Sequence, residues 1–362
     1  MTLAFDSYRN LSDADCEERI RKAKASLGKD LVILGHHYQR EDVYRHADLT
    51  GDSLRLSRLA AQSRAKHIVF CGVHFMAEVA DILTSPEQIA ILPDLSAGCS
   101  MADMANLSKV ERAWRELSSL LDPEETVTPV TYINSAADLK AFCGEHGGIV
   151  CTSSNAGKIL EWAFSKREKV LFFPDQHLGR WSGHKMGIPQ EEMLVWDYDL
   201  PMGGHSVEAI KKARMLLWKG HCSVHQMFQP QHIESFRKKY PEGRVIAHPE
   251  CRFEVCRLSD EVGSTETIIK TIAASPPGTR WLVGTELNLV NRLAGEFGSQ
   301  EKIVQFMSPT FCMCSTMARI DPQHLLWTLE NLLEGHVVNR ITVPENDAKL
   351  AKLALSRMLE AS

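Results

Sequence analysis

The sequence lacks any 18-residue segment that is both apolar and uncharged, so we expect no membrane span. Residues 1–10 contain no basic segment followed by an apolar core, so we expect no secretory signal. Basic residues are not in excess, because 41 Lys and Arg stand against 46 Asp and Glu, and the net charge of -5 disfavours nucleic-acid binding. We therefore expect a cytoplasmic protein with neither a membrane nor a nucleic acid as partner.

Cysteine is also scarce, since ten cysteines among 362 residues are too few for a disulfide scaffold. In a cytoplasmic chain we expect these cysteines to be thiols, some of which can bind a metal or take part in catalysis. The remaining composition, 44% hydrophobic and 24% charged, is typical of a folded protein of two or three domains. The cysteines are therefore the part of the composition that needs an explanation.

Three short apolar runs in the chain each end in polar side chains. The runs cover residues 31–35, 127–131 and 245–247, and each is predicted to be a strand. Because such strands alternate with predicted helices, the sequence favours the α/β class with parallel sheets. The residues that follow the runs are His36, His37 and Tyr38, then Tyr132, Ile133 and Asn134, and then His248, Pro249 and Glu250.

Each run is followed by a hydroxyl residue at a predicted helix start and later by a cysteine. The hydroxyl residues are Ser53, Ser153 and Thr265, and the cysteines are Cys99, Cys222 and Cys314. We interpret this recurrence as three repeats, residues 1–120, residues 121–228 with an insertion, and residues 229–321. Two further helices are predicted within residues 322–362, and we expect both to join the first repeat.

The polar residues are expected at the carboxyl ends of parallel strands, which is where open α/β sheets bind ligands. Three αβα domains around a pseudo-threefold axis would bring these ends to one central active site. Helix N-termini bind carboxylate or phosphate groups, so Ser53, Ser153 and Thr265 are candidate anion-binding residues. The alternative is that these hydroxyls only cap their helices.

The three equivalent cysteines can bind zinc or an iron–sulfur cluster, and three ligands leave one metal position open for a substrate. The alternative for any one cysteine is a buried free thiol. We expect that role for Cys16, Cys71, Cys143 and Cys151, whereas Cys251, Cys256 and Cys312 stay unassigned.

The motifs together resemble the quinolinate synthase (quinolinate synthetase A) family, in its longer, Bacillus-like branch. The resemblance covers nearly the whole chain, and the combination of motifs is specific although each motif alone is short. The motifs include Gly35-His36-His37-Tyr38, Tyr132-Ile133-Asn134-Ser135, Pro174-Asp175-Gln176-His177, His248-Pro249-Glu250-Cys251, Val283-Gly284-Thr285-Glu286 and Cys312-Met313-Cys314.

The resemblance implies three αβα domains and a condensation of iminosuccinate with dihydroxyacetone phosphate that forms quinolinate, phosphate and water in de novo NAD biosynthesis. It implies a [4Fe–4S] cluster with one open iron that acts as a Lewis acid. The resemblance places the cluster ligands on Cys99, Cys222 and Cys314. From the resemblance we also expect a functional link to L-aspartate oxidase, the enzyme that forms unstable iminosuccinate.

Such a reaction, a transferase- or lyase-type condensation with dehydration, needs several proton transfers. We assign Glu250 as general base, and His36, Tyr38 and His248 as proton-transfer or orienting groups. The residues expected to bind substrate are His36, Tyr132, Ile133, Asn134, His248, Pro249 and Glu250, while Ser53, Ser153 and Thr265 are expected to hold its carboxylate or phosphate oxygens. His225 is expected beside the cluster or the substrate, and simple packing is its alternative.

Three other functions remain open at the level of sequence. An aconitase-like hydro-lyase would need similar proton donors and an open iron. A cluster-based regulator would need only the cluster, but the chain has no basic DNA-binding module. Structural zinc is the remaining inorganic alternative for the cysteines.

Overall fold

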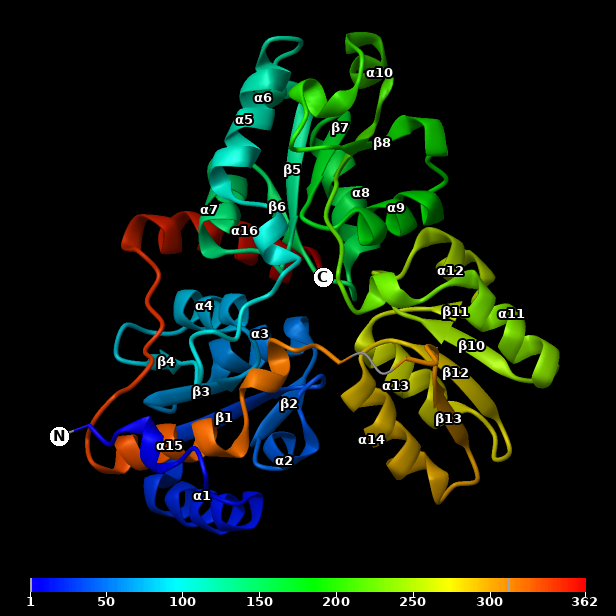
Figure 1. Ribbon diagram of the computed structural model, residues 1–362. Coiled ribbons are helices and arrows are strands. Elements are labelled where there is room, and N and C mark those ends of the chain that lie inside the picture. Colours follow the sequence, from blue (N-terminus) through cyan, green and yellow to red (C-terminus); the bar gives the residue numbers. More distant parts are fainter. Residues whose placement is uncertain (1, 311–312) are drawn as a thin grey trace. The chain divides into compact units, whose positions relative to one another are not determined.

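The computed structural model describes residues 2–310 and 313–362, and within them three parallel β-sheets are flanked by helices (Figure 1). This arrangement confirms the predicted α/β class. The first sheet has the order β2-β1-β3-β4, with β1 (Leu31–His36), β2 (Leu49–Gly51), β3 (His67–Cys71) and β4 (Ile89–Ile91). All of its strand pairs are parallel.

The second and third sheets repeat this arrangement. In all three, the first strand lies between the second and the third, which supports the internal repeat. The second sheet, β6-β5-β7-β9-β8, has β5 (Val127–Tyr132), β6 (Ile149–Cys151), β7 (Lys169–Phe173), β8 (Met193–Trp196) and β9 (Met215–Trp218). The third, β11-β10-β12-β13, has β10 (Arg244–Ala247), β11 (Glu261–Val262), β12 (Arg280–Gly284) and β13 (Ile303–Phe306).

The chain divides into two compact units. The first comprises Met1–Cys99, Glu286–Arg292 and Met313–Pro344, and the second comprises Ser100–Thr285, Leu293–Cys312 and Glu345–Ser362. The first sheet therefore lies in the first unit, and the other two sheets lie in the second. The predicted pseudo-threefold axis and the three domain boundaries stay predictions.

The helices are divided between the units in the same way. The first unit contains α1 (Asp13–Leu27), α2 (Glu41–Tyr44), α3 (Ser53–Gln62), α4 (His74–Leu83) and α15 (Pro322–Leu333). The second contains α5 (Leu107–Ser118), α6 (Pro123–Thr126), α7 (Ala137–Glu145), α8 (Ala156–Lys166), α9 (Gln176–Lys185), α10 (Val207–Lys212), α11 (Pro230–Lys239), α12 (Phe253–Leu258), α13 (Thr265–Ala274) and α16 (Glu345–Ala361). Helix α14 (Leu287–Gly298) begins in the first unit and ends in the second.

The strands that begin the repeats are buried along almost their whole length. Both β1 and β5 are buried at every residue, which suits parallel strands covered by helices on both faces. Strand β1 ends at His36 and β5 at Tyr132, and β10 ends one residue before His248. The structure therefore confirms that the polar groups follow the carboxyl ends of these strands.

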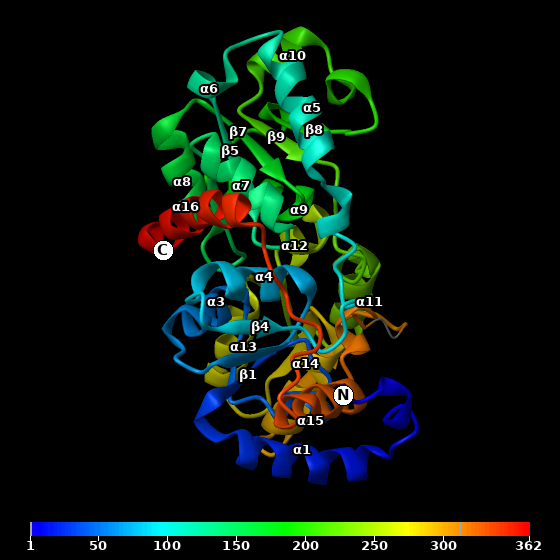
Figure 2. The ribbon, with the colours of Figure 1, turned by 90° about the vertical axis from the view of Figure 1, so that its left-hand side faces the viewer.

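Helix α16 corrects one expectation from the sequence. The two C-terminal helices were expected to join the first repeat, and α15 does pack on α1, but α16 packs on α7 and β6 of the second sheet (Figures 1 and 2). Gly144 of α7 allows this approach, because a Cβ there would lie 1.9 Å from the carbonyl oxygen of Leu350. Arg357 of α16 adds a hydrogen bond of 2.6 Å to the Gly148 carbonyl.

Replacing Gly144 with alanine is expected to destabilise the second unit by about 1–3 kcal/mol, because the methyl group would force the α16 backbone away from α7. Gly295→Ala in α14 is the matched control, since nothing lies within 4 Å of its Cβ position. That control should gain up to about 1 kcal/mol from the higher helix propensity of alanine. Chemical denaturation of the two variants checks the contrast, and equal stabilities would contradict the close contact.

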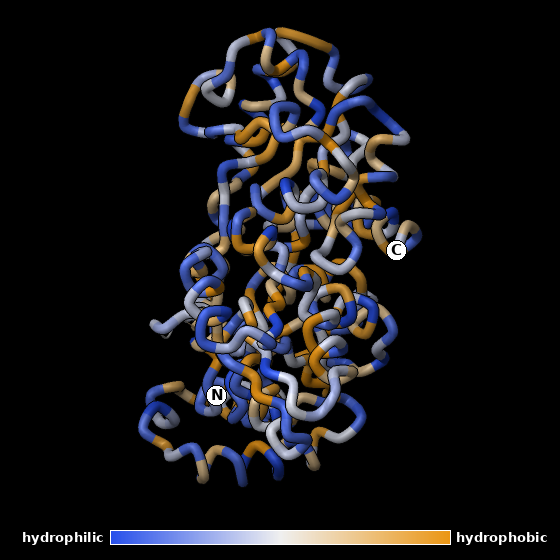
Figure 3. Tube along the Cα trace, turned by 90° about the vertical axis from the view of Figure 1, so that its right-hand side faces the viewer, coloured by the Kyte–Doolittle hydropathy of each residue, from blue (hydrophilic) through white to orange (hydrophobic). Residues whose placement is uncertain are grey.

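Helices α1 and α15 are joined by a carboxylate that accepts three hydrogen bonds. Glu330 accepts two from Arg19, of 2.9 and 2.6 Å, and one of 2.6 Å from the Tyr8 hydroxyl. Helix α1 buries only Cys16, Ile20 and Ala23, and Figure 3 shows its trace as mostly hydrophilic, so this polar contact supplements a small apolar face.

The stabilisation by Glu330 is expected to depend on pH. Partial burial favours a higher pKa, but the hydrogen bonds from Arg19 and Tyr8 outweigh it and lower the pKa of Glu330. A lowered folded-state pKa stabilises the protein above the unfolded value of about 4.3, and the stabilisation is lost as the pH falls further. Glu330→Gln should therefore lower the thermal midpoint more at pH 7 than near pH 3.5. The expected difference at pH 7 is about 1 kcal/mol, because Arg19 is partly exposed; an equal deficit at both pH values would contradict this.

Among the described residues, no helix is long and apolar enough to cross a membrane.

Candidate active site and metal-binding group

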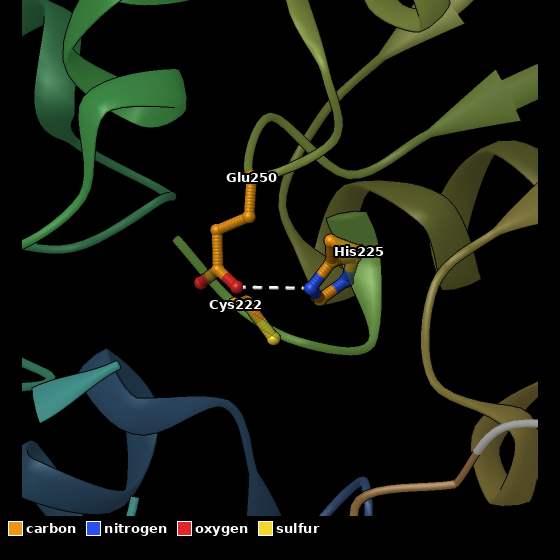
Figure 4. A group of neighbouring side chains, drawn as sticks. All are labelled: Cys222, His225 and Glu250. Atoms are coloured by element: carbon orange, nitrogen blue, oxygen red, sulfur yellow. Dashed lines mark ion pairs between the residues drawn. The ribbon is translucent and has the colours of Figure 1, made fainter. Parts of the chain in front are cut away.

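The second unit brings together side chains from three separate loops at strand ends. The Tyr132 hydroxyl, at the end of β5, donates a 2.6 Å hydrogen bond to Oε1 of Glu250, which follows β10. The other carboxylate oxygen, Oε2, lies 2.9 Å from Nδ1 of His225 (Figure 4). All three side chains are buried. A carboxylate, an imidazole and a phenol thus form one connected polar network, as general acid–base chemistry requires.

Tight turns fix the two strand ends that carry this network. After β5, the Ser135 hydroxyl donates to the Tyr132 carbonyl at 2.8 Å, and the buried Lys140 ammonium donates to the Ser135 carbonyl. After β10, the His248 amide donates to the Gly284 carbonyl at 2.9 Å. The backbone at both ends is therefore held by local hydrogen bonds.

Two imidazoles stack beside the carboxylate. The rings of His225 and His248 have centroids 4.7 Å apart and are inclined by 28°. Nε2 of His225, the nitrogen that does not face Glu250, lies 3.4 Å from the Thr285 hydroxyl. Burial, together with the neighbouring His225, lowers the pKa of His248 to about 3, although Glu250 opposes the shift. His248 is therefore a neutral imidazole at physiological pH.

Two buried carboxyl groups at this network have pKa values shifted in opposite directions. Burial alone favours a higher pKa for Glu250, but His225, His248 and the hydrogen bond from Tyr132 outweigh it and lower the pKa. Asp175 follows β7 and caps α9 by accepting from the amides of His177 and Leu178. Burial and then the charge of Glu250 raise the pKa of Asp175 well above its usual value. Glu250 is therefore the more acidic of the two carboxyl groups.

A thiol lies next to the same carboxylate and imidazole. Ligand atoms of Cys222, His225 and Glu250 all lie within 4.8 Å of one another (Figure 4). Cys222 follows β9, and His225 begins the short 3-10 helix His225–Met227. Thiolate, imidazole and carboxylate are the three common protein ligands of zinc and related metals. The structure therefore contains a group that can hold a metal.

Burial separates the cysteines into two classes. Of the nine that the structure describes, six are buried, and the three that are only partly buried are Cys99, Cys222 and Cys314. Cys16, Cys71, Cys143 and Cys151 are buried as expected for packed thiols, and burial raises the pKa of Cys71 to about 12. The three cysteines predicted as metal ligands are thus the three that retain access to a ligand or solvent.

Two of the unassigned cysteines belong to the core beneath the Glu250 loop. Cys251 and Cys256 are buried with Phe228 and Val255, and the Cys251 thiol lies 3.4 Å from the Gly284 carbonyl. Burial raises the pKa of both thiols, which disfavours the thiolate form. Their role is therefore packing, while Cys312 lies outside the described residues.

The other predicted substrate residues of the second unit lie on neighbouring loops. Oδ1 of Asn134 is buried and has no hydrogen-bond partner among residues 2–310 and 313–362, which suits an atom that binds a substrate. Ile133 is buried in the same turn. Ser153 and Pro249 line one cavity of about 250 Å³. Thr265 is buried at the first position of α13.

The structure assigns helix capping to other residues than the predicted hydroxyls. Asp52 caps α3 and Ser264 caps α13, each through its side chain, while Asn155 precedes α8. Simple capping therefore does not explain Ser53, Ser153 or Thr265. Their role in anion binding stays a prediction.

The remaining predicted site residues lie in the first unit. The rings of His36 and Tyr38 pack edge to face with centroids 4.8 Å apart, and the Tyr38 amide donates to Nδ1 of His36 at 3.1 Å. Ser53 begins α3, and Cys99 lies in the loop after β4. The Cys314 amide donates to Oε1 of Glu286 at 3.3 Å.

The first turns of α14 hold both the Cys314 loop and the loop that carries His36 and Tyr38. Glu286 also accepts from the Asn288 amide at 2.6 Å, and the Asn288 side chain donates to the Tyr38 carbonyl at 3.4 Å. The Arg292 guanidinium lies 3.6 Å from the centre of the Tyr44 ring and donates to the carbonyls of His37 and Gln39. Three residues of one helix start therefore fix two predicted functional loops.

Several residues that make these contacts have no role that their sequence motifs predict. They are Asp175, Thr285, Glu286, Asn288 and Arg292. Asp175, Thr285 and Glu286 belong to motifs that carry the family resemblance. Those motifs mark the three residues as functionally relevant but do not predict what each residue does. Asn288 and Arg292 carried no signal, since nothing in a helix start indicates which distant loop it will contact.

A buried acid–base network at strand ends, next to a group that can hold a metal, defines an α/β enzyme site. The chain belongs to the family of quinolinate synthetase A proteins, whose family model matches residues 18–360. A quinolinate synthase of Acidobacterium capsulatum is 55% identical over 357 residues, which cover 99% of this chain and 96% of that protein. Quinolinate synthases of Herpetosiphon aurantiacus (56%) and Anoxybacillus flavithermus (52%) each match 98% of this chain and 95% of their own length. These matches confirm the family predicted from the motifs and establish that the chain is an enzyme.

Proposed function

We propose that this enzyme condenses iminosuccinate with dihydroxyacetone phosphate to give quinolinate, phosphate and two waters in the de novo synthesis of NAD. The reaction balances without an oxidant or a reductant. The observation that carries the proposal is the ionised Glu250 held between Tyr132 and His225, because carbon–carbon bond formation and dehydration both need a positioned base. The family and its close relatives support the same reaction.

The chain's own residues fit a [4Fe–4S] cluster, and we propose Cys99, Cys222 and Cys314 as its ligands. The support is that these three, alone among the nine described cysteines, are only partly buried, and that Cys222 lies beside Glu250 and His225. When bound, the cluster supplies a Lewis acid at the iron that has no cysteine ligand. Three thiolates and one open position are the donor set that such chemistry needs.

The side chains of the second unit would then divide the proton chemistry among them. Glu250, as an ionised base, takes protons from substrate carbon, while the Tyr132 hydroxyl holds its Oε1 in place. Neutral His248 can accept or donate a hydrogen bond to a substrate oxygen or nitrogen. The unpartnered Oδ1 of Asn134 accepts from a substrate N–H or O–H group. Together these side chains would orient the substrate and transfer its protons.

Other residues complete the proposal. Ser153 and Thr265 of the second unit, and Ser53 of the first, would hold carboxylate or phosphate oxygens. Ile133 and Pro249 would contact the substrate beside Asn134 and Glu250. His36 and Tyr38 would act as further proton-transfer or orienting groups. A functional link to L-aspartate oxidase and a cytoplasmic location belong to the same proposal.

One experiment tests the proposal directly. The protein is purified without oxygen, iron and sulfide are measured, and quinolinate is assayed with both substrates. We expect a cluster and quinolinate. Failure to take up iron and sulfide after a strong chelator has removed any bound metal would overturn the cluster. A full cluster without quinolinate would overturn the reaction and favour a hydro-lyase or a sensor.

Matched cysteine variants test the ligand assignment. Cys222→Ser should lose the cluster, because it removes one of three thiolates, whereas Cys71→Ser should keep it because Cys71 is a buried packing thiol. Iron and sulfide content of the purified variants is the measurement. An intact cluster in Cys222→Ser would remove Cys222 from the ligand set.

A further inference from the structure

The group formed by Cys222, His225 and Glu250 has a composition that differs from that of an iron–sulfur site. Its three ligand atoms are a sulfur, a nitrogen and an oxygen, all within 4.8 Å of one another. In a tetrahedral zinc site, bond lengths of about 2.0–2.3 Å place such atoms about 3.4–3.6 Å apart. Small side-chain rotations therefore suffice to bring the three atoms to one ion.

The side chains of His225 and Glu250 have hydrogen-bond partners of the kind found around metal ligands in proteins. Oε2 of Glu250 and Nδ1 of His225 face each other at 2.9 Å, and a metal would lie against this pair. The far oxygen of Glu250 accepts from Tyr132 at 2.6 Å, and the far nitrogen of His225 lies 3.4 Å from the Thr285 hydroxyl. Hydrogen bonds at the far side of the ligating imidazole and carboxylate orient metal ligands and raise metal affinity.

Charge and burial favour a divalent ion of intermediate softness. A Cys222 thiolate and the Glu250 carboxylate together carry two negative charges, which a divalent ion neutralises. Glu250 and His225 are buried, where an unneutralised charge is costly. Mixed sulfur and nitrogen ligands disfavour magnesium and calcium and suit zinc. The partial burial of Cys222 gives the ion a route to the site.

We propose that Cys222, His225 and Glu250 form a site for one zinc ion in the full chain when it carries no cluster. Zinc there has three protein ligands and one open position. Because Cys222 and Glu250 also belong to the proposed active site, bound zinc prevents cluster assembly and occupies the general base. The zinc site is inferred from the distances among Cys222, His225 and Glu250, from the outer partners of these residues and from their burial. Only the competition with the cluster rests on the proposed function.

The test uses the full chain, prepared without oxygen and without metal, and titrated with zinc against a chromophoric chelator. We expect one tightly bound zinc per chain. Cys222→Ser, His225→Phe and Glu250→Gln should each weaken binding by more than the ~10–100-fold that Thr285→Val, which removes an outer hydrogen bond, should cause. The absorption spectrum of the cobalt-substituted protein provides a second readout. If cobalt binds at the site with Cys222, its charge-transfer band should have the intensity of one thiolate ligand and not of three.

Cys99→Ser and Cys314→Ser are the matched controls, since each removes a proposed cluster ligand from the first unit and none from the zinc site. Both should bind zinc as the parent does. The proposal is overturned if these two variants lose zinc while His225→Phe and Glu250→Gln keep it, because zinc then sits on the three cysteines. Absence of stoichiometric binding overturns it as well. Circular dichroism of each variant excludes unfolding as the cause of a loss.

Competition is measured separately. A chain loaded with one equivalent of zinc should take up no iron and sulfide during anaerobic reconstitution, and a strong chelator should restore uptake. Full cluster uptake in the presence of bound zinc would contradict the shared use of Cys222. Because the zinc titration involves neither a cluster nor quinolinate, a failure of the proposed function leaves its result interpretable.

Discussion

Glu250→Gln is expected to lower kcat by about 10²–10⁴-fold, the usual contribution of a positioned general base. The amide has the shape of the carboxylate and can still accept from the Tyr132 hydroxyl, which lies 2.6 Å from Oε1 in the parent. It carries no charge, however, and cannot take a proton from a substrate at neutral pH. The fold and the substrate affinity should therefore change little, while the chemical step slows.

Steady-state kinetics of the cluster-loaded enzyme measure this effect, and iron and sulfide content is checked in parallel. Glu254→Gln is the matched control, because Glu254 lies four residues later on the exposed side of α12. That variant should keep the parent kcat. A Glu250→Gln enzyme that retains more than a tenth of the parent kcat would remove Glu250 from the role of base.

Arg292→Ala is expected to lower kcat/KM by about 10²-fold without loss of the cluster, because small misplacements of catalytic groups cost rates of that order. The guanidinium is mostly buried, holds the carbonyls of His37 and Gln39 and stacks on Tyr44. Removing it releases the loop that places His36 and Tyr38. Lysine should not replace it, since an ammonium lacks the planar fork that reaches two carbonyls.

Chemical rescue separates this positioning role from a general loss of stability. Added guanidinium ion should restore part of the activity of Arg292→Ala, because it can refill the space over the Tyr44 ring, and it should not help Arg292→Lys. Arg280→Ala is the control, since Arg280 stacks on Tyr240 at 4.0 Å and donates to Gln305 at 3.4 Å, and neither partner is a predicted site residue. Activity of Arg292→Ala equal to that of the control would show that the contact with the loop is dispensable.

The strand ends could be predicted because burial leaves a direct trace in the sequence. A continuous apolar run such as 31–35 is typical of a parallel strand covered on both faces, and the polar residues directly after it fall at the ligand-binding edge. The position of α16 could not be predicted in this way. Its partner is set by Gly144, and a single glycine does not reveal which helix will approach it.

The partners of the site residues were also beyond the sequence. Tyr132 and Glu250 are 118 residues apart, and His225 and Thr285 are 60 apart, so only the folded chain shows that they touch. The three cysteines proposed as cluster ligands were predicted from their recurrence, and their partial burial agrees with that choice. The recurrence gave no indication that His225 and Glu250 lie beside Cys222 in a group that can hold a metal.

The first compact unit is assembled from three stretches of chain, and this affects the order in which the protein can fold during synthesis. Tyr8 and Arg19 meet Glu330 more than 300 residues later, so the contacts between α1 and α15 form only after α15 has left the ribosome. The second unit has almost all of its residues much earlier, apart from α16. The first unit therefore cannot be completed in the vectorial order, from the N-terminus onwards, that is usual for successive domains. Its residues 1–99 gain their contacts with residues 313–344 only after residues 100–285 of the second unit have been made.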